Sequence, residues 1–229
     1  MVEFIFMLTR NDQTVADCLE LCDLIRPLKL AHIGFKDVGV DLGTLHKLAG
    51  KIREMGASTY MEVVSTTRQA CLESAKAAVA LGVEHLLGGT EVDATLDVIR
   101  GTNIRYYPFP GKPAGHPTQL GGNAALVEAQ CRDFMAKGCA GADLLAYRAT
   151  EDDPLRLVGA ARRGLGNGRL IVAGSIDSAD RIAHVAKQGA DAFTIGSAIF
   201  NGSYAPDKGS TLSQLADVIR DIKNGVSAG

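Results

Sequence analysis

The sequence lacks an excess of charge of either sign. Its 24 lysine and arginine residues nearly balance its 26 aspartate and glutamate residues, and the net charge is −2 when the histidines are neutral. A chain with so little net charge has no overall field that attracts nucleic acid or an anionic membrane. We therefore expect neither as a partner, and a bound anion has to be held by local groups.

Long apolar runs are also absent. No stretch of the sequence approaches the roughly 18 consecutive apolar residues that indicate a membrane-spanning helix. The first residues, Met1-Val2-Glu3, do not form the basic segment that begins a signal peptide. With 46% hydrophobic and 22% charged residues, the composition is typical of a folded globular protein.

Cysteines are few and lack the spacing of disulfide or zinc motifs. The five cysteines include no C-x-x-C pair: Cys18, Cys22, Cys71, Cys131 and Cys139. An odd number argues against a disulfide framework and favours a reducing, cytoplasmic location. Cys18 and Cys22 have the spacing of neighbours on one helix face, but no histidine lies near them in sequence, so an apolar face is the better interpretation. We assign no metal and no cofactor, and leave a lone Mg²⁺ open.

What the sequence does contain is a repeat. Gly56, Gly82, Gly138 and Gly189 each end an alanine-rich helical segment and precede an extended one. Glycine is favoured at such helix ends because it adopts a left-handed backbone without a steric penalty. Their spacing corresponds to one, two and two units of roughly 27 residues, and 229 residues hold about eight units. Eight strand–helix units predict an α/β fold, a (βα)₈ TIM barrel in a single domain over residues 1–229.

Short apolar segments supply the eight expected strands, and their continuous apolar character is typical of buried parallel strands. They cover residues 3–9, 31–35, 58–64, 85–88, 104–109, 143–147, 170–173 and 192–195. Helix start signals lie between them. Asp12, Ser65, Asn123 and Asp177 are placed as N-caps, and Pro154 suits a first helical turn.

One connection is much longer than the others. Residues 110–122, after the fifth expected strand, contain three prolines and four glycines. Strand-to-helix connections usually have only about two to six residues. An ordinary surface excursion would explain the length, but loops after barrel strands all face the end that carries active sites. We favour an active-site lid, with His116 as its candidate functional side chain.

Two Gly-Ser pairs, Gly174-Ser175 and Gly196-Ser197, end the seventh and eighth expected strands. Glycine lets the backbone approach an anion closely, and the N–H groups around the serines can point at its oxygens. In such barrels the loops after strands seven and eight frequently build a phosphate site with a short extra helix. Tight turns that need glycine for packing are the alternative. We predict that Gly174, Ser175, Gly196 and Ser197 bind the phosphate of a small-molecule substrate.

With these turns the chain resembles a known superfamily. The segments GSIDSADRI and GADAFTIGSAIF resemble the phosphate-binding end of the ribulose-phosphate-binding barrels, and the repeat extends the likeness to the whole chain. That superfamily contains phosphosugar isomerases, epimerases and decarboxylases. The resemblance therefore implies a substrate with a phosphate ester and a carbonyl group or an enolisable carbon.

No single family within that superfamily is identified. The segment Ile33-Gly34-Phe35-Lys36-Asp37 is similar to a strand end of acylmannosamine-phosphate epimerases, but Ala173-Gly174-Ser175 stands where those enzymes carry an acidic residue. The Asp-x-Lys-x-x-Asp pattern of the decarboxylase and hexulose-phosphate synthase group is not present either.

Polar residues at the C-terminal strand ends are the catalytic candidates, because active-site side chains in this fold come from there. Lys36 and Asp37 are adjacent, so on a strand they point opposite ways, and a surface ion pair is their alternative. Glu62 is flanked by apolar residues and needs a partner or a raised pKa, which suits a general base or a pair with Lys36. Arg148 could hold a carboxylate, a second phosphate or an enediolate oxygen, unless it is an exposed loop arginine.

The leading hypothesis is an enzyme of sugar-phosphate metabolism, an isomerase or epimerase of a phosphorylated sugar or sugar acid. Glu62 or Asp37 would remove a proton next to a carbonyl, and Lys36 would stabilise the enediolate. One alternative is a lyase, an aldolase or decarboxylase that uses Lys36 as a Schiff base or an electrostatic stabiliser. Another is a non-catalytic barrel that binds a phosphometabolite. The sequence leaves the oligomeric state open, a homo-oligomer included.

Overall fold

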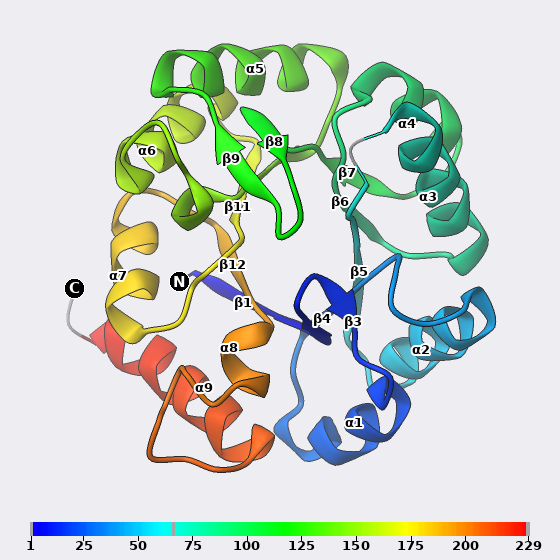
Figure 1. Ribbon diagram of the computed structural model, residues 1–229, viewed down its shortest axis with the longest axis vertical. Coiled ribbons are helices and arrows are strands. Elements are labelled where there is room, and N and C mark those ends of the chain that lie inside the picture. The colour runs from blue at the N-terminus through cyan, green and yellow to red at the C-terminus, as the bar shows by residue number, and fades with distance from the viewer. Residues whose placement is uncertain (1, 66, 228–229) are drawn as a thin grey trace.

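In the computed structural model, which describes residues 2–65 and 67–227, eight parallel strands form one closed barrel (Figure 1). Their order is β10-β11-β12-β1-β4-β5-β6-β7. They are β1 (Glu3–Met7), β4 (His32–Lys36), β5 (Ser58–Val63), β6 (His85–Gly88), β7 (Arg105–Tyr107), β10 (Gly141–Leu144), β11 (Arg169–Val172) and β12 (Ala192–Ile195). The end strands close the ring, since the Ala140 N–H donates to the Tyr106 carbonyl at 2.9 Å and the Asp143 N–H to the Pro108 carbonyl at 3.1 Å. The predicted (βα)₈ barrel is confirmed.

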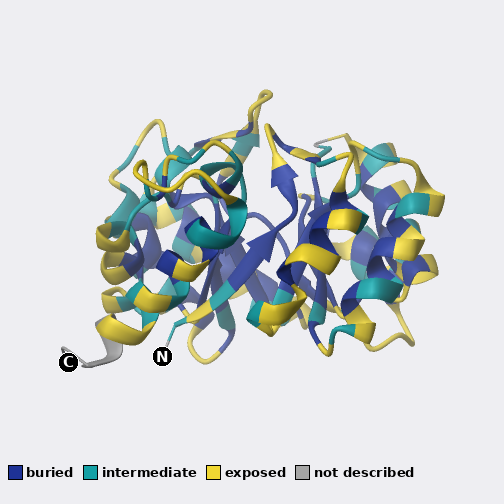
Figure 2. Cartoon of the chain, turned by 90° about the horizontal axis from the view of Figure 1, so that it is seen from below, coloured by how far each residue is buried: buried dark blue, intermediate teal, exposed yellow. Residues whose placement is uncertain are grey.

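Helices surround the strands and form the outer layer of the barrel, except the short α8, which lies inside α9 at the cavity (Figures 1 and 2). They are α1 (Cys18–Ile25), α2 (Leu42–Glu54), α3 (Arg68–Leu81), α4 (Val92–Ile99), α5 (Ala124–Lys137), α6 (Pro154–Leu165), α7 (Ala179–Lys187), α8 (Ser197–Phe200) and α9 (Thr211–Ser227), with 3₁₀ turns η1 (Arg26–Leu28) and η2 (Ala146–Arg148). Of the described helices, none is long and apolar enough to cross a membrane.

The glycine repeat has the predicted physical basis. Gly56, Gly82, Gly138 and Gly189 follow α2, α3, α5 and α7, and their φ angles lie between 63° and 93°. This left-handed conformation is strained for other residues, so glycine recurs at these four helix ends, where the chain returns to the barrel.

The helix starts agree with the predicted caps only in part. Asn123 caps α5 and Pro154 is the first residue of α6, as predicted. The predicted caps Ser65 and Asp177 are wrong. Thr67 caps α3 and Ser178 caps α7 instead. Asp12 is wrong for a different reason, since it lies in the turn of a short hairpin rather than at a helix.

The sixth strand lies earlier than predicted. It covers Gly141–Leu144, while part of the expected range forms the 3₁₀ turn η2. The strand starts at a glycine because β10 and β11 approach each other closely there. A Cβ atom at position 141 would overlap the Arg169 backbone.

The barrel interior has an apolar middle. Alternate residues of each strand point inward, and one buried apolar cluster consists of Ile5, Met7, Tyr60, Leu87, Tyr107, Ile171 and Ala192. A second, larger cluster fills the space between strands and helices. Lys36 and Glu62, at the C-terminal ends of β4 and β5, are buried and charged. These buried charged side chains therefore lie at the C-terminal end of the barrel.

Two short hairpins stand at that end of the barrel. β2 (Thr9–Arg10) and β3 (Gln13–Thr14) follow β1, and β8 (Lys112–Ala114) and β9 (Gln119–Gly121) lie within the long connection 110–122. The second hairpin projects toward the middle of the ring (Figure 1). Its Leu120 is fully buried, which fixes it to the body of the molecule.

Candidate active site

A cavity of about 110 Å³ opens among the C-terminal strand ends. Its lining comes from β1, β4, β5, β12 and the segments that follow the barrel strands. The lining residues are Met7, Thr9, Asp12, Lys36, Glu62, Leu145, Arg148, Gly174, Ser175, Ile176, Thr194, Ile195, Gly196, Ser197 and Ala198. The structure thus brings Lys36, Glu62, Arg148 and both predicted Gly-Ser pairs to one cavity.

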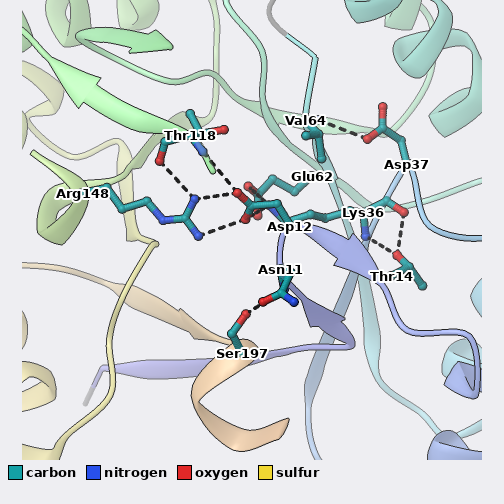
Figure 3. A network of polar contacts seen from close by, with 10 residues as sticks. All are labelled: Asn11, Asp12, Thr14, Lys36, Asp37, Glu62, Val64, Thr118, Arg148 and Ser197. Carbon is teal, nitrogen blue, oxygen red and sulfur yellow. Dashed lines mark hydrogen bonds and ion pairs between the residues drawn. The ribbon is translucent and has the colours of Figure 1, made fainter. Parts of the chain in front are cut away.

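Lys36 is the centre of a network of charges (Figure 3). It is the last residue of β4, and only 6% of it is exposed. Its Nζ donates to Glu62 Oε1 at 2.8 Å and to Asp12 Oδ1 at 3.1 Å. Glu62 faces it because β4 and β5 pair in parallel with these two residues in register. An ammonium group has three N–H donors, so one remains for a ligand.

Asp12 is a site residue that the sequence reasoning missed. Asn11 and Asp12 are the central residues of the β2–β3 turn, with φ angles of 52° and 58°. Asparagine and aspartate tolerate this conformation, and an Asn-Asp pair between two extended segments is a hairpin signal that could have identified the turn. The turn places the carboxylate against Arg148, whose Nη1 and Nη2 donate to Oδ2 and Oδ1, both at 2.9 Å (Figure 3).

The network balances two carboxylates against two cations. Burial acts to raise the pKa of Asp12, but the hydrogen bonds and charges of Arg148 and Lys36 outweigh it and hold that pKa far below its usual value. Burial acts to lower the pKa of Lys36, but Glu62 and Asp12 outweigh it and raise that pKa. Asp12 and Lys36 are therefore both charged at neutral pH. In the described part of the chain, no group of three or more His, Cys, Asp or Glu residues is placed to hold a metal ion.

Arg148 reaches the cavity from η2 and makes three hydrogen bonds there. Besides its two bonds to Asp12, its Nη1 donates to the Thr118 carbonyl at 3.1 Å. Its aliphatic part lies over Gly174, where an added Cβ atom would come within 3.0 Å of Arg148 Cγ and Cδ. Arg148 is thus a partly buried structural partner of Asp12 rather than an exposed loop arginine.

The two Gly-Ser turns also line the cavity. Gly174 and Ser175 both have left-handed backbones, with φ angles of 77° and 57°. The Ser197 Oγ accepts the Asn11 N–H at 3.2 Å, which ties the second turn to the β2–β3 hairpin. Among the described residues, no acceptor takes the backbone N–H of Ser175 or of Ser197. These two donors are therefore free to bind a ligand.

Two predicted residues lie away from the cavity. Asp37 points opposite to Lys36, with Oδ1 accepting the Val64 N–H at 3.1 Å and Oδ2 accepting the Ser74 hydroxyl, so it joins the end of β4 to β5 and α3. Burial raises the pKa of Asp37. His116 is exposed in the turn between β8 and β9 and, in the described structure, contacts no polar partner.

The β8–β9 hairpin reaches the charge network through Thr118. The Thr118 N–H donates to Asp12 Oδ2 at 3.3 Å, and its carbonyl accepts from Arg148. At the base of the hairpin the Gly122 N–H donates to Glu151 Oε2 at 2.9 Å. The long connection is thus an ordered hairpin with one side of its turn bound to the site, and its function as a lid stays a prediction.

Asp143 is the second residue that the sequence reasoning missed. It lies on β10 with no exposed surface, and neither carboxyl oxygen has a hydrogen-bond partner among the described residues. Burial raises its pKa well above the usual value, Glu62 adds to the rise, and Lys36 and Arg148 oppose it. The protonated form of Asp143 is therefore favoured far more than in an ordinary aspartate. Its apolar flanking residues are the same signal that identified Glu62, and could have identified it.

No family model and no curated protein matches the sequence. Solved structures do match in fold. Orotidine 5′-phosphate decarboxylase from Pyrococcus horikoshii OT3 is 11% identical with a TM-score of 0.66, over 96% of this chain and 99% of that one. N-(5′-phosphoribosyl)anthranilate isomerase from Pyrococcus furiosus is 13% identical with a TM-score of 0.64, over 98% and 100%.

A mandelate oxidase with an FMN adduct is 13% identical with a TM-score of 0.67, over 98% of this chain and 74% of that one. A decarboxylase, an isomerase and an oxidase thus share this architecture, and identities this low show the fold alone. The resemblance to ribulose-phosphate-binding barrel enzymes therefore holds at the level of the fold.

Proposed function

We propose that this chain is an isomerase that moves a proton next to the carbonyl group of a phosphorylated sugar or sugar acid. The observation that supports it is the hydrogen-bonded pair of Lys36 and Glu62 in a cavity that Ser175 and Ser197, with free backbone N–H groups, also line. The cavity thus combines groups for proton transfer with groups for a phosphate.

Glu62 is the proposed base. Its Oε1 accepts from Lys36, while its Oε2 accepts no hydrogen bond from a described residue. A carboxylate oxygen without a donor is free to take a proton from a substrate carbon. Because Lys36 holds the other oxygen at 2.8 Å, the direction of the free oxygen is fixed before the substrate binds.

Lys36 is the proposed stabiliser of the enediolate. Two of its three donors bind Asp12 and Glu62, and the third is available for the oxygen on which negative charge develops. The raised pKa of Lys36 keeps it an ammonium ion, which cannot attack a carbonyl carbon. This favours proton transfer over an aldolase that forms a Schiff base at Lys36. Asp12, whose two carboxyl oxygens accept hydrogen bonds from Arg148, positions the ammonium group of Lys36.

A single free base favours isomerisation over epimerisation. Epimerisation commonly needs a second acid on the opposite face of the substrate carbon, whereas one carboxyl group can carry a proton between two neighbouring carbons on the same face. Asp12 has both oxygens bound, and Asp37 points away from the cavity. Glu62 is then the proposed carrier that takes the proton from one carbon and returns it to the next.

Proton exchange tests the function directly. The protein is incubated in D₂O with aldose and ketose phosphates of four to six carbons, and ¹H NMR follows the loss of the signal next to the carbonyl. We expect exchange with one or more of these compounds and conversion between aldose and ketose. The Glu62→Gln variant should lose at least about a hundredfold in rate, the lower end of what one general base contributes.

A matched control variant removes one carboxylate, as Glu62→Gln does, but at a position outside the cavity. Asp37→Asn removes a neighbouring carboxylate that does not line the cavity, so it should retain most of the exchange rate while it loses stability. Binding without exchange or conversion across the whole panel would show a non-catalytic phosphometabolite-binding barrel instead. Equal exchange rates in the wild type and in Glu62→Gln would contradict the assignment of Glu62 as the base.

A further inference from the structure

Building on the proposed function, we propose that the substrate carries no charge besides its phosphate: it is a phosphorylated aldose or ketose and not a phosphorylated sugar acid. The observation behind this is that each cation in the cavity already has a carboxylate partner from the protein. A second anionic group on the substrate would add negative charge to a network whose cations are already balanced.

The charged lining of the cavity consists of Asp12, Lys36, Glu62 and Arg148. Arg148 has both Nη atoms on Asp12 at 2.9 Å, and Lys36 lies between Glu62 and Asp12 at 2.8 and 3.1 Å. A substrate carboxylate could accept the remaining N–H of Lys36, but it would then be a third negative charge beside two cations that Asp12 and Glu62 already balance.

Hydroxyl and carbonyl groups fit the unoccupied positions of the network. Glu62 Oε2 accepts hydrogen bonds and is free, and Lys36 has one N–H donor left. A sugar hydroxyl can donate to the first, and a carbonyl oxygen can accept from the second. A carboxylate is an acceptor only, so it would face Glu62 with repulsion and no hydrogen bond.

Asp143 shows how this environment treats one more carboxyl group. It has no exposed surface, feels the negative charge of Glu62, and has no hydrogen-bond donor among the described residues. Burial is the largest cause of its raised pKa, and Glu62 raises that pKa further, while Lys36 and Arg148 oppose the rise. A substrate carboxylate beside Glu62 would meet the same repulsion, because Asp12 and Glu62 already balance the two cations.

Arg181, Arg10 and Lys112, the other cations discussed near this end of the barrel, do not serve as partners for a substrate carboxylate. Arg181 donates to the Ser175 carbonyl at 2.5 Å and to Asp177 at 2.9 Å, so it holds the first Gly-Ser turn in place. Arg10 and Lys112 are exposed and do not line the cavity. The phosphate is received by the free backbone N–H groups of Ser175 and Ser197 and not by these cations.

Matched ligand pairs test the proposal on the wild-type protein. Each pair has the same chain length and phosphate but a sugar or an acid at the reacting end: erythrose 4-phosphate with erythronate 4-phosphate, ribose 5-phosphate with ribonate 5-phosphate, and glucose 6-phosphate with gluconate 6-phosphate. Dissociation constants are measured by calorimetry at one pH and salt concentration, with inorganic phosphate as the reference.

We expect inorganic phosphate to bind and, for the pair that fits best, the sugar phosphate to bind at least about tenfold more tightly than the acid, since like charges across a binding site are strongly disfavoured. An acid that binds as tightly as its sugar, or more tightly, overturns this inference and leaves the proposed function standing. Absence of binding by phosphate and by every sugar phosphate overturns the proposed function, and the inference with it.

A variant pair tests the physical reason. Glu62→Gln removes one negative charge and leaves a cation in excess, so the preference for the sugar should shrink at least about tenfold and the acid should gain affinity. Asp97→Asn makes the same change of charge on α4, where the side chain is 67% exposed, and should leave the preference unchanged. Equal changes in both variants would mean that net charge and not the cavity sets the preference, which contradicts the proposal.

Discussion

At the scale of single residues, Asp143 couples the stability of the barrel to pH. Its pKa is raised in the folded protein, first by burial and then by the charge of Glu62, whereas in an unfolded chain an aspartate releases its proton near pH 4. The folded state therefore binds a proton that the unfolded state has lost. As pH rises from about 4 toward the folded-state pKa, the free energy of unfolding falls by up to about 1.4 kcal/mol per pH unit from this residue.

We predict that Asp143→Asn removes this contribution. The amide has nearly the same shape as a protonated carboxyl group and does not ionise. Relative to the wild type, the variant should gain unfolding free energy as pH rises from about 4 toward the raised pKa of the folded Asp143, up to about 1.4 kcal/mol for each unit. Urea denaturation at several pH values measures this difference, and a difference that does not vary with pH would contradict the prediction.

The sequence predicts which polar residues lie at the strand ends, but it does not predict the direction in which each side chain points. Lys36 and Asp37 are adjacent, and the sequence is compatible with either one facing the cavity. The register of β4 against β5 decides, because it places Lys36 opposite Glu62 inside the barrel and turns Asp37 toward Val64 and Ser74. That register follows from closing the whole ring, which no local pattern contains.

The contacts of Asp12 show the same limit more strongly. Its partners Lys36 and Arg148 lie 24 and 136 positions further along the chain. Locally, an aspartate before a helical segment resembles a cap, and a cap is what the sequence predicts at this position. Only the folded barrel brings the β2–β3 turn over the strand ends, so the partner that matters is invisible in the neighbouring residues.

At the scale of elements, the turn after β12 is built against the β2–β3 hairpin. A Cβ atom at Gly196 would lie 2.5 Å from Thr9 Oγ1 and 2.7 Å from the Thr9 carbonyl oxygen. The φ angle of Gly196 is −130°, so close approach and not backbone conformation requires glycine here. Any side chain at this position has to push the hairpin away, and with it Asn11, which donates to Ser197.

We predict opposite effects for two glycine-to-alanine substitutions. Gly196→Ala should cost about 1–3 kcal/mol of unfolding free energy through overpacking and should weaken the binding of inorganic phosphate. Gly50→Ala, in the middle of α2 with no atom within 4 Å of the new methyl group, should gain about 0.5–1 kcal/mol because alanine is the better helix former. Chemical denaturation of both variants and calorimetry with phosphate check this pair, and a stabilised Gly196→Ala would contradict it.

The repeat made the strands and helices of the barrel predictable, whereas the two added hairpins could not be predicted from it. The units of α2, α3, α5 and α7 each end in a glycine with a physical reason to be there, so the spacing of these glycines indicates the architecture. The strands of the β2–β3 hairpin have only two residues each, too few for any alternation of apolar and polar positions. The long connection 110–122 was recognisable by its length, while its pairing into β8 and β9 depends on burial of Leu120 against the barrel.

At the scale of the whole molecule, the two ends of the barrel differ in what they contribute. Away from the cavity, the interior holds aromatic rings in contact: Tyr60 stacks on His85 with ring centres 4.0 Å apart, and His85 Nδ1 lies 3.3 Å from the Tyr107 hydroxyl. Residues at the N-terminal end of barrel strands serve stability and not chemistry. Substitutions there should change unfolding and leave the cavity unaffected.

We predict that His85→Phe flattens the acid limb of the stability curve. Burial, with smaller effects from Arg169 and Arg105, lowers the pKa of His85 to about 3, so the folded protein holds it neutral. An unfolded histidine takes a proton below about pH 6.5, so the wild type loses unfolding free energy as pH falls from there to about 3. Phenylalanine keeps a ring for Tyr60 and cannot take a proton.

The measurement is urea denaturation of both proteins between pH 3 and 7, with phosphate binding at neutral pH as a second readout. The wild type should lose more stability than His85→Phe over this range, and phosphate should bind both equally. Parallel stability curves would contradict the prediction for His85. Altered phosphate affinity would contradict the separation of the two ends.

The balanced charges around Lys36 also bear on how fast a ligand arrives. Asp12 and Glu62 cancel Lys36 and Arg148 at the cavity, and the chain as a whole has a net charge of −2. An approaching phosphate dianion therefore meets no attractive long-range potential, and diffusion alone delivers it. Its encounter rate should depend only weakly on ionic strength, in contrast to sites that collect anions with a funnel of unpaired lysines and arginines. Affinity then depends on the contacts that form after the phosphate has arrived, and therefore on the dissociation rate rather than on the association rate.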